Sequence, residues 1–140
     1  MSWDVIIFNV SNEIKSVSEL TEDAIKPLGS RDNVLSAIKT TFPQANLSDP
    51  SWVVQDGAGY SIEFSLGQND PIQTMMVYVR GDISSLRAIE QFCRTTGWRA
   101  FDSSVGDFID FSDLNYDRGF KRWEQYKNYV ASKHSQNEDE

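Results

Sequence analysis

The chain has 140 residues, 39% of them hydrophobic, and a formal net charge of −8 at pH 7. This length predicts one domain with a sizeable core, and the acidic charge argues against nucleic acid or an anionic membrane surface as a partner, since both bind basic faces. The charge favours a basic protein partner instead, because opposite charges attract at long range.

The first third of the chain predicts a strand, an irregular connection and a helix. The segment from Trp3 to Val10 is apolar on both faces at its centre, which indicates a central strand covered on both sides. Residues 11–29 are polar and predict a connection with little regular structure. Ser30 is a good N-cap for a helix that reaches about Thr41 and that Pro43 ends.

Three strands joined by short turns follow, and they predict a meander. The segments are 52–55, 60–66 and 72–79, and the last of them is apolar on both faces, as in a central strand. Asp82 is then a good N-cap for a second helix, which Gly97 ends.

The end of the chain completes the predicted architecture. Short strands at 98–101 and 107–111 precede a third helix, which begins near residues 112–113 and has a broad aromatic face. The order of elements predicts a single α+β domain over residues 1–132, with a mixed or antiparallel sheet, a three-strand meander and about three helices packed mainly on one face. Residues 133–140 predict a disordered acidic tail, and the aromatic helix face leaves both a monomer and a homodimer open.

Histidine and cysteine are almost absent. The one histidine, His134, lies in the polar C-terminal segment, and the one cysteine, Cys93, lies on an apolar helix face, where we expect an inert buried thiol. This scarcity argues against a histidine base, a Cys–His pair and a metal site rich in either residue. We therefore expect no enzyme activity, no cofactor and no bound metal. With no signal-peptide pattern, no membrane-spanning apolar run and no disulfide framework, the sequence predicts a cytoplasmic protein.

An aspartate series is the strongest candidate for chemistry. Its members, which have no lysine or arginine among them, are Asp102, Asp107, Asp110, Asp113 and Asp117. Carboxylates gathered in this way can bind a hard cation, attract a basic protein or act as an acid–base pair. Their spacing lacks the ligand pattern and the glycine of a calcium loop. Turn and helix-cap roles explain most of the series, and partner binding is the next interpretation.

A second acidic stretch covers residues 40–79, which contain no basic residue. It includes Asp56 and Asp70 in turns and Glu63 on the polar face of a strand. If these carboxylates converge, they form a landing surface for a cationic partner, although an ordinary acidic surface is an equal alternative. The predicted partner-binding residues are therefore Asp102, Asp107, Asp110, Glu63, Asp56 and Asp70.

Arginines and tryptophans are the remaining candidates. Arg87 and Arg94 share the outer face of the second helix. No glycine-rich phosphate loop lies beside them, so the sequence predicts salt bridges to a partner rather than an anion site. The four tryptophans could form a stacking platform, but their positions at strand starts and on a helix face favour the core.

Several short segments give the chain a resemblance to known proteins. They are Trp3–Asn9, Phe42–Pro43, Ile62–Phe64, Val79–Gly81, Gly97–Trp98, Asp102 and Gly106–Asp110. Over roughly residues 2–112 the chain resembles a group of small bacterial proteins of undefined function, which are similar in build to the immunity-type proteins that accompany secreted bacterial toxins. The segments are signatures of fold rather than of catalysis, so the resemblance carries over no functional residue.

The hypothesis that follows is a non-catalytic binding protein, an immunity-like protein that binds and blocks a cognate toxin domain. Many toxin domains are basic, and an acidic inhibitor matches their charge. The alternative is a carboxylate-dependent metal-binding or hydrolytic domain that uses the Asp102–Asp117 cluster. This alternative requires at least two of the carboxylates to converge in a concave pocket.

Overall fold

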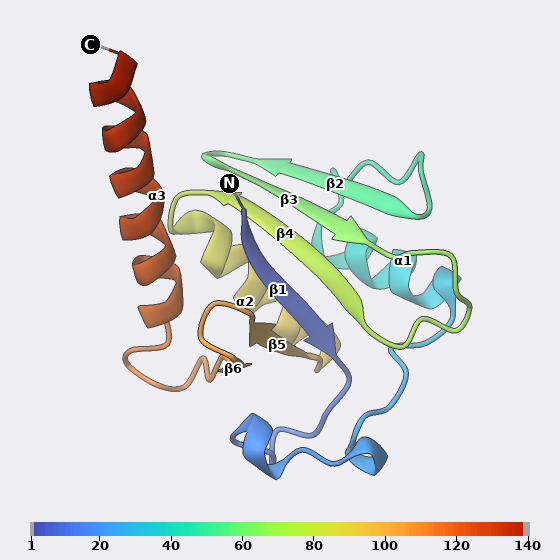
Figure 1. Ribbon diagram of the computed structural model, residues 1–140. Helices are drawn as coiled ribbons and strands as arrows, with labels where there is room; N and C mark the ends of the chain where they lie inside the picture. Colours follow the sequence, from blue (N-terminus) through green and yellow to red (C-terminus); the bar gives the residue numbers. More distant parts are fainter. Residues whose placement is uncertain (1, 139–140) are drawn as a thin grey trace.

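The sheet of this protein is built entirely from antiparallel pairs. A computed structural model describes residues 2–138, in which six strands form one open sheet with the order β2-β3-β4-β1-β5-β6 (Figure 1). The elements, in chain order, are β1 (Trp3–Phe8), η1 (Val17–Glu19), η2 (Glu22–Ala24), α1 (Arg31–Thr41), β2 (Trp52–Gly57), β3 (Tyr60–Ser65), β4 (Met75–Gly81), α2 (Ser84–Thr96), β5 (Arg99–Asp102), β6 (Asp107–Phe108) and α3 (Arg118–Glu138). The predicted α+β class and the β2–β3–β4 meander are confirmed.

Strand β1 is central, as its apolar sequence predicts. It pairs with β4 on one side and β5 on the other, so β4 and β5 run parallel to each other and are connected through α2. The prediction that both faces of β1 are covered is wrong. Trp3, Val5 and Ile7 are buried, whereas Ile6 and Phe8 on the opposite face are only partly buried. The reason is that α1 and α2 both lie behind the sheet in Figure 1 and leave the other face without a helix.

The core fills the space between these two helices and the sheet. Phe92 of α2 is fully buried and packs its ring against Phe42, Phe64 and Trp98. Two of the predicted helix signals are confirmed, but the prediction that Asp82 is the N-cap of the second helix is wrong. Ile83 occupies that position without a side-chain cap bond, and Asp82 accepts a hydrogen bond from the backbone N–H of Ser84 in the turn before the helix. The Ser30 side chain accepts a hydrogen bond from the backbone N–H of Asn33 at 3.2 Å, and Gly97 takes a left-handed conformation with a φ of 78° where α2 ends.

Helix α3 differs from its prediction at both ends. It begins at Arg118 rather than near residues 112–113, because the side chains of Asp110 and Asp113 accept hydrogen bonds from the backbone two residues ahead and hold this segment in turns. It continues to Glu138, whereas the sequence predicts a disordered tail from residue 133 onward. No proline or glycine follows Gly119 to end the helix, and residues 139–140 lie outside the described part.

Only the first turns of α3 pack on the domain. Phe120 and Trp123 are buried, whereas Tyr126 and Tyr129 are exposed, and Figure 1 shows the rest of the helix projecting past the sheet. Across the described residues, no helix combines the length and the apolar character that crossing a membrane requires.

Candidate functional site

Asp102 is a structural residue. It is only 3% exposed, and its Oδ1 accepts hydrogen bonds from Trp3 Nε1 at 3.1 Å and from the backbone N–H and the hydroxyl of Ser104 at 2.8 and 2.6 Å. These bonds connect the end of β5 to β1 and to the turn that follows. Because so little of this carboxyl group is open to a partner, Asp102 is not part of the binding surface that we propose below.

The carboxylate of Asp107 joins β6 to the segment between β1 and α1. Its carboxylate accepts hydrogen bonds from the Ser16 hydroxyl at 2.9 Å and from the backbone N–H of Val17 at 2.8 Å. Burial opposes ionisation, but the backbone N–H groups of Val17 and Phe108 outweigh it and lower the pKa of Asp107. Asp107 thus holds η1 in place, and most of its acceptor capacity is already used within the chain.

The rest of the aspartate series serves its own turns. Asp110 accepts hydrogen bonds from the hydroxyl and the backbone N–H of Ser112, and these bonds lower the pKa of Asp110. Asp113 accepts from the backbone N–H of Asn115 at 2.9 Å, and Asp117 pairs with Lys121 at 3.0 Å.

The convergence that a carboxylate-dependent domain requires is not found. Of the five aspartates, only Asp110 lines the pocket beside β5 that is described below. Residues 2–133, whose side chains the structure describes, contain no group of three or more histidine, cysteine or acidic side chains arranged to hold a metal ion.

The three acidic residues of the meander separate into two places. Asp56 on β2 and Glu63 on β3 share one face of the sheet, where Glu63 pairs with Arg80 at 3.2 Å. Asp70 lies in the β3–β4 connection, near the other end of these strands, and its carboxylate accepts a hydrogen bond from the backbone N–H of Arg31 at 3.1 Å. The structure thus brings two of the three predicted residues together.

Asp56 and Glu63 belong to the sheet face that no helix covers, which we call the open face. On the first four strands its side chains are those of Asp4, Ile6, Phe8, Trp52, Val54, Asp56, Ser61, Glu63, Ser65, Met76, Tyr78 and Arg80. The rings of Trp52 and Tyr78 stack with centroids 5.7 Å apart and planes 22° apart. Trp52 stays 39% exposed, so the stacked pair is a flat aromatic platform that solvent can reach. The sequence-based assignment of Trp52 to the core is wrong for this reason.

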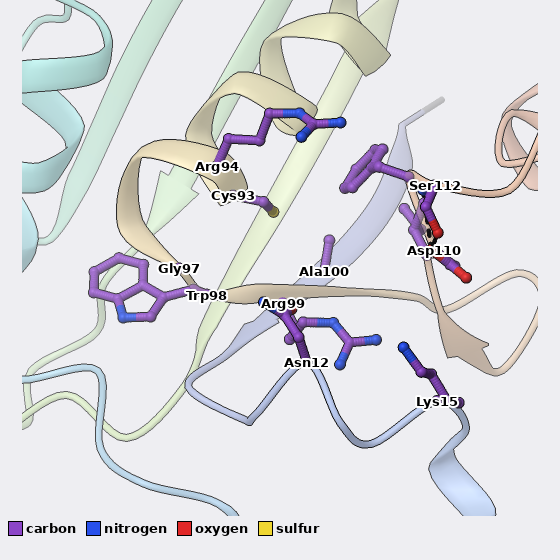
Figure 2. A pocket seen from close by; sticks show the side chains of 12 residues that line it. Asn12, Lys15, Cys93, Arg94, Gly97, Trp98, Arg99, Ala100, Asp110 and Ser112 are labelled. Carbon is purple, nitrogen blue, oxygen red and sulfur yellow. Dashed lines mark hydrogen bonds between the residues drawn. The ribbon is translucent and has the colours of Figure 1, made fainter.

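A second candidate site is a pocket of about 500 Å³ between the end of α2, β5, the N-terminal connection and residues 109–112 (Figure 2). Its charged lining consists of Lys15, Arg94, Arg99 and Asp110. Cys93 lies on its inner wall, where burial raises the pKa of the thiol to about 12, so this cysteine is protonated and is not a nucleophile.

Sequence reasoning missed this pocket. Of its three basic residues, Arg94 and Arg99 lie close together in sequence, on α2 and β5, whereas Lys15 lies in the connection after β1, and the pairing of β1 with β5 brings these two parts of the chain together. No local motif marks any of the three. The interpretation of Arg94 as a residue for partner salt bridges also changes, because Arg94 pairs with Glu90 of its own helix at 2.9 Å.

Comparisons with protein-family models, with curated proteins and with solved structures give no match to this chain. The residues and the geometry of the open face and of the pocket are therefore the basis on which a function is proposed.

Proposed function

We propose that this is a non-catalytic binding protein of the immunity type, which blocks a basic bacterial toxin domain by binding it on the open face. The single observation that carries the proposal is the exposed Trp52–Tyr78 platform on a sheet face without a helix, where Glu63 lies opposite Tyr78 and Asp56 lies near the far end of β2. We place this activity in the cytoplasm.

The aromatic platform supplies the means of tight binding. Tryptophan and tyrosine are enriched at the centres of protein interfaces, where they bury a large rigid surface and keep a polar tip for a hydrogen bond. Ile6, Phe8 and Met76 extend the platform across β1 and β4, and all three side chains are partly exposed. A partner that covers these side chains removes their apolar surface from water, which stabilises the complex.

The charges at the open face supply the preference for a basic partner. The listed side chains of the open face include three acidic residues, Asp4, Asp56 and Glu63, and one basic residue, Arg80. The whole chain carries a net charge of −8. Such a field speeds the encounter with a cationic protein, and the effect weakens as salt rises. A toxin domain that acts on nucleic acid has a basic active-site face, which an acidic inhibitor fits.

The experiment is an affinity capture of the tagged protein from a lysate of the cells that encode it, with washes at low and high salt and identification by mass spectrometry. We expect one basic protein in equal amount to the bait, which high salt releases. A Trp52→Ala/Glu63→Lys bait should lose that protein. The matched control, Asp32→Lys/Tyr126→Ala, makes the same change of charge and removes one aromatic ring at exposed positions on α1 and α3, so it should keep the partner.

The two double variants decide the outcome. Equal capture by the wild-type protein and the Trp52→Ala/Glu63→Lys variant would place the interface elsewhere. The loss of the partner from both variants would show that the open face is not specific. Circular dichroism spectra of all baits confirm that each one is folded.

A further inference from the structure

The pocket beside β5 has the chemistry of a small-molecule site. We propose that it binds an organic anion whose carboxylate or phosphate group lies between Lys15, Arg94 and Arg99 and whose apolar body lies against the inner wall. This site lies at the β5 side of the sheet, away from Trp52 on β2, and the inference does not depend on the proposed function.

The shape of the pocket suits such a ligand. Its volume of about 500 Å³ falls within the range of pockets that hold small molecules, about 300 to 1,000 Å³. The inner wall is made of the buried and apolar side chains of Cys93, Ala100 and Ile109. Polar and charged groups line the remaining space together with Trp98 and Phe111, so one ligand can bury an apolar body and keep its charged end near solvent.

The charge of the pocket is opposite to that of the protein. The chain has 13 lysine and arginine residues against 21 aspartate and glutamate residues, yet the pocket has three basic side chains and one carboxylate. A pocket with this balance concentrates anions, because its low-dielectric walls focus the field of the three cations. Asp110 is occupied by hydrogen bonds from Ser112.

Arg99 is the group that most needs a counterion. Arg99 is only 8% exposed, and its guanidinium lies 4.9 Å from the centre of the Phe108 ring. The hydrogen bonds that it makes to described residues both leave from Nη1, toward the backbone carbonyls of Ser11 and Ile14. Among the described residues no carboxylate oxygen lies within 4.0 Å of Arg99. A buried charge without an ion pair is unfavourable, so an anion at Nε and Nη2 would stabilise it.

The other two cations complete the arrangement. Figure 2 shows the ammonium group of Lys15 pointing toward the guanidinium of Arg99, while the guanidinium of Arg94 lies apart from them, at the other side of the pocket beside α2. Among the described residues no carboxylate oxygen lies within 4.0 Å of Lys15, although Asp110 attracts both Lys15 and Arg99 from farther away, and the two cations repel each other. One carboxylate or phosphate group between them replaces this repulsion by two attractions. Arg94, which is exposed and pairs with Glu90 on its own helix, can turn toward the same group.

The test measures thermal stability and calorimetric binding of the wild-type protein with four probes: phenyl phosphate, benzoate, inorganic phosphate and the neutral analogue benzamide. We expect phenyl phosphate or benzoate to raise Tm in proportion to the logarithm of its concentration, because a ligand that binds only the folded state stabilises it by mass action. The two probes distinguish a phosphate from a carboxylate ligand. Benzamide and inorganic phosphate should have much weaker effects, since each lacks one half of the recognised structure.

Variants at the exposed cations keep the test independent of folding. Lys15→Ala and Arg94→Ala should each weaken binding of the active probe by about tenfold, which corresponds to one charged hydrogen bond. The controls Lys39→Ala and Arg87→Ala remove one exposed cation away from the pocket and should leave binding unchanged. Arg99→Gln should abolish binding, although it also removes the bonds to Ser11 and Ile14.

Three results would overturn the proposal. The first is that neither organic anion raises Tm or gives measurable binding. The second is that benzamide binds as tightly as benzoate, which would show that charge is not recognised. The third is that the Lys15 and Arg94 variants bind the active probe as tightly as the two control variants do.

Discussion

Replacing Asp102 by alanine should destabilise the fold strongly, although this residue belongs to an acidic series that the sequence assigns to a surface. All three hydrogen bonds that Asp102 accepts end on one oxygen, Oδ1. Their donors are the indole N–H of Trp3, which is 1% exposed, and two groups of Ser104 in an exposed turn. Alanine leaves all three donors without their acceptor.

The size of the loss follows from which donors water can reach. The indole N–H of Trp3 has no access to water, and an unsatisfied buried donor costs about 1–3 kcal/mol. The Ser104 groups can hydrate, so they add roughly 1 kcal/mol. We expect Asp102→Ala to lower the free energy of unfolding by about 2–4 kcal/mol, a large part of the 5–15 kcal/mol typical of a domain.

Urea unfolding followed by tryptophan fluorescence measures this loss. With an m-value of about 2 kcal/mol/M, the midpoint should fall by roughly 1–2 M. Asp102→Asn keeps an oxygen for all three donors and should lose less than half as much. Glu63→Ala, which removes an exposed ion pair, should change the free energy by at most about 0.5 kcal/mol. If Asp102→Ala is as stable as Glu63→Ala, the buried hydrogen-bonded role of Asp102 is refuted.

Three further predictions concern the same region and its neighbours. Gly119→Ala should lower Tm, although alanine normally stabilises a helix by about 1 kcal/mol, because the added Cβ would collide with the Asp102 carboxyl group; a higher Tm would contradict this packing. Cys93 should resist a thiol reagent in the native protein and react once urea unfolds it, since burial raises its pKa to about 12; rapid native labelling would refute its burial. The pKa of Asp107 is lower in the folded protein than in the unfolded chain. The Asp107 carboxylate therefore stabilises the fold at pH values above its unfolded pKa, and this stabilisation is lost as the pH falls through its folded pKa. Between about pH 6 and about pH 3, the free energy of unfolding in urea should change less for Asp107→Asn than for the wild-type protein, and an equal change would contradict the lowered pKa.

Much of the fold is predictable because its signals are local. Ser30 caps α1 and Gly97 ends α2 through groups within a few residues of each other. The apolar run of β1 correctly indicates a central strand. It does not reveal that one face stays open, because Ile6 and Phe8 are as apolar as the buried residues beside them, and only the placement of the helices decides which face they cover.

The candidate sites were less predictable because they depend on distant contacts. Asp102 and Trp3 are 99 residues apart, and nothing near Asp102 in the sequence shows that its carboxyl group is buried. The pocket cations Lys15 and Arg99 are likewise far apart along the chain. By contrast, the turn roles of Asp110 and Asp113 follow from serine and asparagine two residues ahead, which is a local pattern that sequence reasoning can use.

Nuclear magnetic resonance with the captured partner tests the central claim most directly, since it locates the interface on the labelled protein. The four tryptophans give separate indole N–H signals, of which Trp3 is hydrogen-bonded to Asp102 and Trp52 is on the open face. We predict that addition of the partner shifts the Trp52 indole signal and the backbone amides of β2, β3 and β4, and leaves the Trp3 signal in place. An unchanged Trp52 signal, with shifts confined to α1, α2 or α3, would contradict a partner on the open face.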